Sequence, residues 1–196
     1  MLPEGRAAAD KVIYDAANLR YIAENAGKKG LEKRAPATGW TVRQTIGHLA
    51  FALHSYADSL PVLTGVEPGN PGGFDVAAFN AETAARTEKM PLPRILEELA
   101  DGRDRCIDAF LALAEGDLDR PAGGAQTVRD LLRIWQCHFE THALDLLDAM
   151  PVFEQDPMVL NWVLHADFSA QPGLLERRQQ LAARVREWLL EHQEDE

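Results

Sequence analysis

Long stretches of apolar residues at helical spacing, separated by glycine and proline, constrain the fold of this chain more than any other feature. Apolar residues at i, i+3, i+4 and i+7 form one face of a helix, whereas a half-buried strand alternates apolar and polar residues. Stretches of the first kind cover most of the 196 residues, and no convincing alternating stretch occurs. With 46% apolar residues, the chain can bury a sizeable core. The pattern predicts an all-α protein.

Four long helices are expected in the first 150 residues. They are predicted over residues 5–27, from the N-cap Thr41 to about Leu63, from Pro91 and Pro93 to about Leu113, and from the N-cap Thr127 to about Met150. Gly27 to Gly30 should end the first helix, a short helix is expected over residues 74–89, and residues 114–126 should form a loop. Four long helices with one long crossover make a four-helix bundle.

Residues 151–196 are expected to form a helical extension packed on the bundle of residues 1–150. Asp156 and Pro157 suit the N-cap and first turn of a short helix, and a last amphipathic helix follows from about Gly173. The apolar residues of that last helix could pack on the bundle or mediate a homodimer. The sequence leaves both possibilities open.

Charge and composition exclude several classes of protein. The formal charge of −11 repels phosphate backbones, and no basic patch is visible, so nucleic acid is not an expected partner. No apolar run approaches the roughly 18 to 20 residues of a membrane span, and no secretory signal is evident. Cys106 and Cys137 are too few for a disulfide framework. We therefore expect a cytoplasmic protein without a membrane partner.

Two of the six histidines lie where the fourth helix should present apolar side chains to the core. His138 and His142 fall within its apolar stripe, and at i,i+4 spacing they lie about 40° apart on one face. Burying an imidazole without a partner costs free energy, so each ring needs hydrogen-bond partners or a metal. The spacing leaves both interpretations open.

A three-ligand metal site needs a third donor from a neighbouring helix, and His48 is the best candidate. It lies beside the apolar stripe of the second helix, in a row of small and polar residues that could line a cavity. His54 lies about 120° away around the same helix. His165 and His192 belong to the carboxyl-terminal extension, and their spacing does not recommend them.

The residues next to the histidine pair in the sequence are not expected to act at a metal site. Cys137 points about 100° away from His138 on a helix, which makes it a poor co-ligand. A zinc protease of the HExxH type carries glutamate directly after its first histidine, where this chain has Phe139. Glu140 lies about 200° around the helix from His138, where it cannot act as a base at a metal. The sequence therefore disfavours a zinc protease.

Three segments carry a resemblance to a known family. GWTVRQTIGHLA at residues 39–50 is similar to a Trp-Thr-Val-Arg…His-Leu signature, FDVAAFNAETAAR at residues 74–86 is similar to an Asp-Val-x-x-Phe-Asn stretch, and the third segment is His138-x3-His142-x2-Asp145. In this order they resemble the DinB-like superfamily and, within it, the relatives of mycothiol-dependent maleylpyruvate isomerase. The matches span most of residues 1–150.

The resemblance implies an up-down-down-up four-helix bundle that binds one divalent metal, zinc or nickel, through His48, His138 and His142. Three protein ligands leave an open coordination position. In thiol-dependent members this position is thought to receive a low-molecular-weight thiol such as mycothiol, bacillithiol or glutathione. The resemblance therefore implies a metal and a thiol co-substrate.

Three further residues are candidates for supporting roles. Asp145 lies one turn beyond His142 and could orient an imidazole, or it could be a surface carboxylate. Arg43 and Trp40 could form the mouth of the pocket, although Trp40 could equally pack on the start of the second helix.

Two departures from the isomerase-like relatives affect the expected function. Those relatives tend to have glutamate where His138 stands, and they carry an α/β domain for which residues 151–196 are too short and too helical. One expected function is a metal-dependent enzyme that uses a thiol for S-transfer or isomerisation of a small-molecule substrate. The alternatives are a non-catalytic metal- or small-molecule-binding stress-response bundle and, third, a dimerising interaction module.

Overall fold

The computed structural model describes residues 2–69, 74–123, 125–166 and 172–192. Its helices are α1 (Pro3–Asn25), α2 (Gly27–Leu31), α3 (Val42–Leu63), α4 (Val76–Thr87), α5 (Leu92–Leu111), α6 (Val128–Ala149), α7 (Pro157–Leu164) and α8 (Pro172–His192). Two 3-10 helices, η1 (Glu115–Asp117) and η2 (Pro151–Gln155), and two very short strands, β1 (Pro121–Gly123) and β2 (Gln126–Thr127), complete the described elements. The all-α prediction is confirmed.

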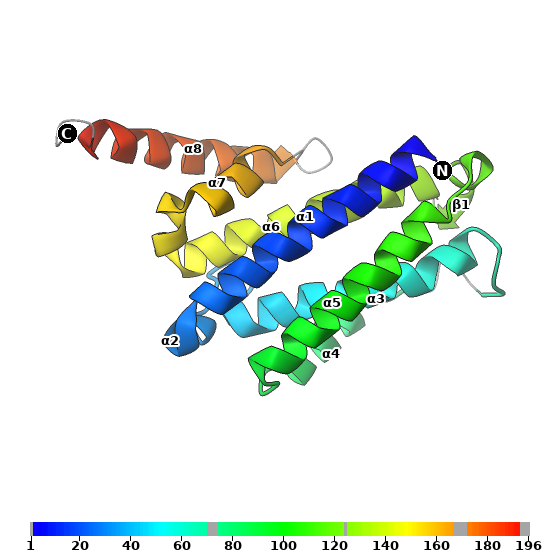
Figure 1. Ribbon diagram of the computed structural model, residues 1–196, viewed down its shortest axis with the longest axis horizontal. Helices are drawn as coiled ribbons and strands as arrows, with labels where there is room; N and C mark the ends of the chain where they lie inside the picture. The colour runs from blue at the N-terminus through cyan, green and yellow to red at the C-terminus, as the bar shows by residue number, and fades with distance from the viewer. Residues whose placement is uncertain (1, 70–73, 124, 167–171, 193–196) are drawn as a thin grey trace.

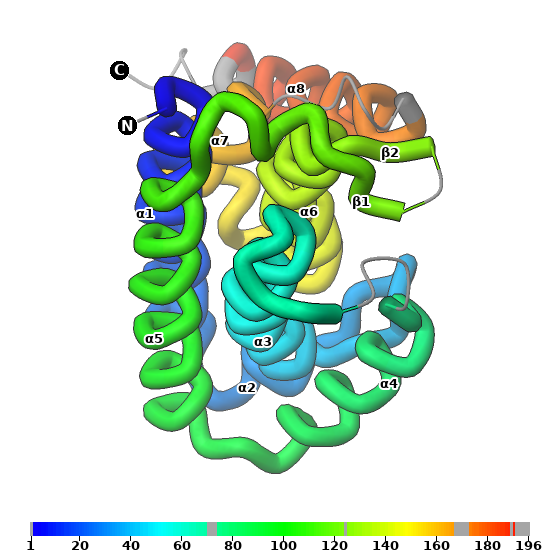
Figure 2. Tube along the Cα trace, turned by 90° about the vertical axis from the view of Figure 1, so that its right-hand side faces the viewer, coloured from blue at the N-terminus to red at the C-terminus, as the bar shows by residue number. Residues whose placement is uncertain are grey.

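The four long helices α1, α3, α5 and α6 form the bundle (Figures 1 and 2). Both α5 and α6 contact α1 and α3, so each fills one side of the space between those two helices. In Figure 1, α1 and α6 run in one direction while α3 and α5 run in the other. The parallel pair α3 and α5 is joined by a crossover through α4, which packs on α3. The up-down-down-up topology is therefore confirmed.

Threonine caps fix the beginnings of the two helices that carry the candidate histidines. The Thr41 hydroxyl oxygen accepts a hydrogen bond from the Gln44 backbone N–H (3.1 Å), and the Gln44 side chain accepts one from the Thr41 N–H (2.9 Å). Thr127 and Asp130 form the same reciprocal pair at the start of α6. Both predicted N-caps are confirmed. Each of these reciprocal pairs, known as a capping box, satisfies two backbone N–H donors that would otherwise be unpaired at the start of the helix.

Two connections differ from the prediction. Gly27 does follow the end of α1, but with φ of +63° it also begins the separate helix α2, in which Gly30 lies. Glycine adopts positive φ without a Cβ clash, which allows the abrupt change of direction. The predicted loop over residues 114–126 contains η1 and the antiparallel pair of β1 and β2. These strands are too short to show a two-residue period in the sequence.

The residues after α6 lie against the bundle. Asp156 caps α7 as predicted, accepting hydrogen bonds from the backbone of Met158 (2.9 Å) and Val159 (3.3 Å). Helix α8 contacts α6 and α7, on the side of the bundle opposite α4 (Figures 1 and 2), and its Leu181 is buried. The division into units at residue 150 stays a prediction. Among the described helices, none has the length and apolar composition that crossing a membrane requires.

Candidate metal centre

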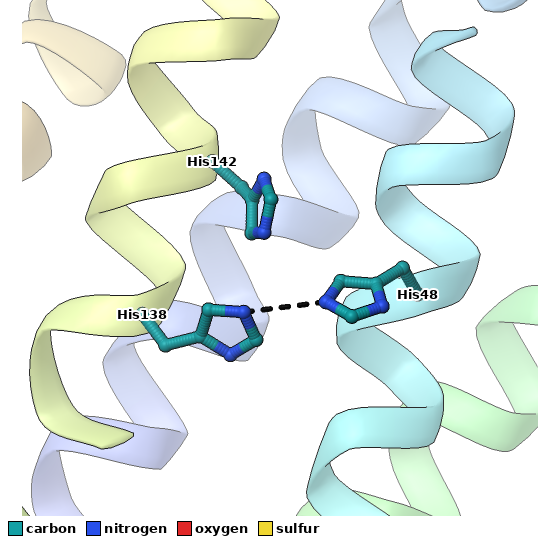
Figure 3. Close-up of side chains that lie close together, drawn as sticks. All are labelled: His48, His138 and His142. Carbon is teal, nitrogen blue, oxygen red and sulfur yellow. Dashed lines mark hydrogen bonds between the residues drawn. The ribbon is translucent and has the colours of Figure 1, made fainter. Parts of the chain in front are cut away.

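Three histidines from two helices face one another inside the bundle. His48 extends from α3, and His138 and His142 extend from α6 (Figure 3). The Nε2 atoms of His48 and His138 lie 3.2 Å apart, and one ring nitrogen from each of the three lies within 4.8 Å of the other two. The ring centroids are 4.9 to 5.2 Å apart. The structure thus brings together the three predicted ligands.

The second ring nitrogen of His48 and of His142 has its own hydrogen-bond partner. Nδ1 of His48 lies 3.1 Å from Oγ1 of Thr83 on α4. The Thr83 hydroxyl donates to the Phe79 carbonyl (2.9 Å), so its oxygen can accept the Nδ1 proton. Nδ1 of His142 lies 3.0 Å from Oδ2 of Asp145, and a carboxylate accepts that proton. Both arrangements leave the Nε2 lone pair available.

His138 has a partner that accommodates either tautomer. The Tyr56 hydroxyl, on α3, hydrogen-bonds to Nδ1 of His138. When Nε2 of His138 donates to Nε2 of His48, the phenol donates to Nδ1. When Nε2 of His138 is free to bind a metal, Nδ1 carries the proton and the phenol oxygen accepts it. Tyr56 therefore supports the ring in both states.

These nitrogens fit a divalent transition metal. Two nitrogens bound to one tetrahedral zinc at about 2.0–2.1 Å lie about 3.3 Å apart, close to the separation of the His48 and His138 Nε2 atoms. Ligating histidines usually donate their other N–H to an oxygen, and Thr83, Tyr56 and Asp145 supply such oxygens here. Imidazole suits zinc and nickel among other metals. A buried group of three histidines that could hold a metal ion is therefore present.

Burial also keeps two of the rings in the form that binds metals. Desolvation, together with the nearby His142, lowers the pKa of His48 to about 3. Desolvation lowers the pKa of His138 well below its usual value, and His142 and His48 contribute further. Both rings are therefore neutral at physiological pH. Neutral imidazole is the ligand form, so binding requires no proton to leave these two rings.

Aromatic rings cover the histidines. The Trp40 ring centroid lies 5.0 Å from that of His48 and 5.9 Å from that of His142, with an angle of 20° between the ring planes in the second pair. Phe79 of α4 meets His48 edge-on at 5.5 Å. Of the two predicted places for Trp40, the ring contacts favour the one beside the histidines. Phe79 is the phenylalanine of the Asp-Val-x-x-Phe-Asn stretch, for which the sequence predicted no role at the histidines.

The two remaining candidates differ in their contacts. Asp145 is buried and touches a histidine, so it is not a surface carboxylate. The Arg43 guanidinium hydrogen-bonds to the Glu32 carboxylate (2.8 Å) and to the Met90 carbonyl (2.9 Å). These contacts tie the start of α3 to the residue that follows α2 and to the connection between α4 and α5. These contacts give Arg43 a structural role, and its place at the mouth of the pocket stays a prediction.

The other histidines lie apart from this group. Nε2 of His54 lies 3.1 Å from the Glu98 carbonyl oxygen, and its Nδ1 lies 3.1 Å from the Arg105 guanidinium. His165 is exposed after α7, and the side chain of His192 lies outside the described residues. None of these three was predicted as a ligand, and in the described part of the chain none of them belongs to the group that could hold a metal ion.

The polar neighbours of the histidine pair on α6 also lie elsewhere. The buried Cys137 thiol donates to the Ile134 carbonyl at 3.3 Å. Glu140 forms an ion pair with Lys11 of α1, on a different side of α6 from the histidines. Both placements agree with the helical angles of the sequence analysis. A carboxylate that does reach this pair is that of Asp145, three residues beyond His142.

Sequence reasoning missed two of the residues that hold the rings. Tyr56 lies at helical spacing from Leu53 and Leu60, and a phenol on a buried stripe signals a need for a hydrogen-bond partner. Thr83 carried no such signal, because its role depends on how α4 lies against α3. The packing of those two helices supplies the contact.

The close approach of α4 to α3 depends on Gly47. A Cβ atom at this position would lie 2.3 Å from Cγ2 of Thr87, so α4 would have to move. We expect Gly47→Ala to lower the free energy of unfolding by about 1–3 kcal/mol, the usual cost of overpacking, only partly offset by the better helix propensity of alanine. Gly116→Ala is the control, since a Cβ there would meet nothing within 4 Å. Equal denaturation midpoints for the two variants would contradict this prediction.

The comparisons with known proteins agree with this geometry. The model of the DinB superfamily matches residues 14–146, which is more than half of the 196-residue chain and contains all three histidines. No curated protein and no solved structure matches the chain. On the strength of the family match and the helical bundle, the chain belongs to the DinB superfamily.

Proposed function

We propose that this protein binds one divalent metal ion, zinc or nickel, through Nε2 of His48, His138 and His142. The observation that carries the proposal is that each Nδ1 has a separate oxygen partner, which leaves the three Nε2 lone pairs to share one ion. Three protein ligands leave a coordination position open, as in catalytic zinc sites.

We further propose that the protein uses a low-molecular-weight thiol, such as mycothiol, bacillithiol or glutathione, for S-transfer or isomerisation of a small electrophilic substrate. A bound metal would favour the thiolate form of a thiol at the open position. The chain would contribute the fixed imidazole orientations, and Trp40 and Phe79 would limit the access of water to the rings. This proposal places the protein in the reducing cytoplasm.

A second function has a specific observation in its favour. An arginine at the mouth of the pocket, the place predicted for Arg43, could bind an anionic group of a thiol or substrate, but the Arg43 guanidinium is engaged by Glu32 and the Met90 carbonyl. This engagement favours a bundle of the stress-response type that binds a metal or small molecule without turnover. The two functions share the metal site and differ in whether a thiol reacts there.

Metal analysis and a thiol screen separate these functions. We expect the purified protein, loaded with zinc or nickel, to hold about one metal ion per chain by mass spectrometry, as a single three-ligand site requires. The loaded protein is then mixed with electrophiles and with each thiol in turn. Metal-dependent conjugation with one thiol supports the enzyme, whereas full metal loading without turnover by any thiol supports the binding bundle. Clearly sub-stoichiometric metal contradicts the metal site that the two functions share.

A further inference from the structure

The carboxyl-terminal helix α8 reaches the metal centre through one arginine. Nη2 of Arg177 lies 3.1 Å from Oδ1 of Asp145 and 2.7 Å from Oδ2 of Asp148. The other oxygen of Asp145, Oδ2, lies 3.0 Å from Nδ1 of His142. The guanidinium, the carboxylate and the imidazole therefore form a continuous chain from α8 to the histidines. Arg177 lies outside residues 14–146, the segment that matches the family.

The burial of Asp145 makes its second partner important. Its side chain is only 4% exposed, and a buried carboxylate is costly unless both charge and hydrogen-bonding capacity are satisfied. Arg177 supplies the positive charge at one oxygen, which fixes the carboxylate so that the other oxygen accepts from His142. That bond keeps the proton of His142 on Nδ1 and directs the Nε2 lone pair toward the other two rings.

His142 differs in this respect from the other two histidines. Nδ1 of His48 and of His138 is held by the neutral hydroxyls of Thr83 and Tyr56, which belong to the bundle. The partner of His142 is a carboxylate, and that carboxylate is bound by the carboxyl-terminal helix. An effect of α8 on the metal site would therefore act through His142.

We propose that α8 is part of the metal centre and that Arg177 is a positioning residue, which orients the ligand His142 through Asp145. This inference rests on the proposed metal site. Thermodynamic linkage requires that the docking of α8 and the binding of metal strengthen each other equally. The carboxyl-terminal extension thus sets the affinity of a site whose ligands all belong to the bundle.

Zinc titration of the full-length chain tests the proposal. Dissociation constants are measured by competition with a chromophoric chelator for the wild type, Arg177→Ala, Asp145→Asn and the double variant. We expect Arg177→Ala to weaken zinc binding about 10-fold and Asp145→Asn by about 10- to 100-fold, the range for partners of metal ligands. The double variant should match Asp145→Asn alone, because the arginine acts through that carboxylate. Fully additive losses would overturn the proposal.

Arg184 provides a matched control on the same helix. It binds Glu154 of η2 at 2.6 Å, so Arg184→Ala removes an arginine–carboxylate pair that docks α8 without touching Asp145. This variant should keep the zinc affinity within about twofold of the wild type, whereas Arg177→Lys, which retains a cation, should lose less than Arg177→Ala. If Arg184→Ala weakens zinc as much as Arg177→Ala, general docking of α8 explains the effect and the positioning role is wrong.

The tautomer of His142 gives a readout that needs no metal. Nitrogen NMR of the metal-free protein should show the Nδ1–H form in the wild type and in Arg184→Ala, and a mixture of tautomers in Arg177→Ala. A wild type that binds no zinc contradicts the proposed function, while this measurement still reports on Arg177. A wild type that binds zinc, with the same His142 tautomer in every variant, contradicts the role of Arg177 alone.

Discussion

His138→Ala is expected to weaken zinc binding by more than about 100-fold, because loss of groups that merely hydrogen-bond to a ligand already costs 10- to 100-fold. His138 is the central ring of the site: its Nε2 lies 3.2 Å from that of His48, and its Nδ1 bonds to Tyr56. Alanine removes one of three donors, and two imidazoles cannot complete the same site. His142→Ala should have a similar effect.

Competition titration against a chelator measures this loss, with His54→Ala as the control. His54 is another partly buried histidine, and it interacts with Glu98 and Arg105 away from the metal site. Its replacement should leave the zinc affinity unchanged. Circular dichroism of each metal-free variant shows whether the bundle is still folded. Folded His138→Ala and His142→Ala variants with wild-type affinity would rule out this ligand set.

Lys11→Met is expected to lower the free energy of unfolding by about 3 kcal/mol near pH 8, the cost of removing one partner from a buried ion pair. Lys11 of α1 forms ion pairs with Asp15 and with Glu140 of α6. Both carboxylate side chains are 2% exposed, and the Trp162 indole donates to Asp15 at 2.9 Å. Methionine keeps the length of the side chain but leaves two buried carboxylates without this cation.

The loss should be smaller at pH 5, because Asp15 binds a proton there and then interacts less with the Lys11 cation. Burial, together with the charge of Glu140, raises the pKa of Asp15 to about 7, although Lys11 and the Trp162 hydrogen bond act in the opposite direction. In the unfolded chain the pKa of an aspartate is about 3.9. The contribution of this group to stability is therefore complete below about pH 4 and is lost as the pH rises through 7.

A comparison with Asp15→Asn isolates this contribution, since asparagine keeps a side-chain oxygen for Trp162 but does not titrate. This comparison is needed because His48 changes the stability in the opposite sense. The pKa of His48 is lowered to about 3, so its contribution to stability is present above about pH 6.5 and is lost as the pH falls. Chemical denaturation from pH 5 to 8 should show the wild type losing stability relative to Asp15→Asn as the pH rises. A constant difference between the two proteins would contradict the prediction.

The helices that position the site were predictable because their signals are local. Thr41 and Thr127 each bond within four residues, so the sequence marks where α3 and α6 begin. The i,i+4 spacing of His138 and His142 places both on one face of any helix. His48 stood out because its row on α3 is small and polar, which is unusual beside a core stripe.

The rest of the site depends on contacts between residues far apart in the chain. Sequence alone does not show that Glu32 and the Met90 carbonyl bind the Arg43 guanidinium, because these partners lie 11 and 47 residues away in the chain. Trp40 had two possible places, and its distances to His48 and His142 favour one of them. Thr83 was missed because its contact with His48 depends on the close approach of α4 at Gly47.

The sequence by itself determined the helical class, the helix caps and the three histidines as a possible ligand set, because periodicity and capping act over a few residues. Only the tertiary structure decided which oxygen holds each imidazole, and these oxygens come from three different helices, on Tyr56, Thr83 and Asp145. It also revealed the link from Arg177 to His142. Hydrogen bonds of this kind depend on atoms placed within about 3 Å. Packing between helices sets these distances for Tyr56, Thr83 and Arg177, whereas Asp145 lies on the same helix as His142.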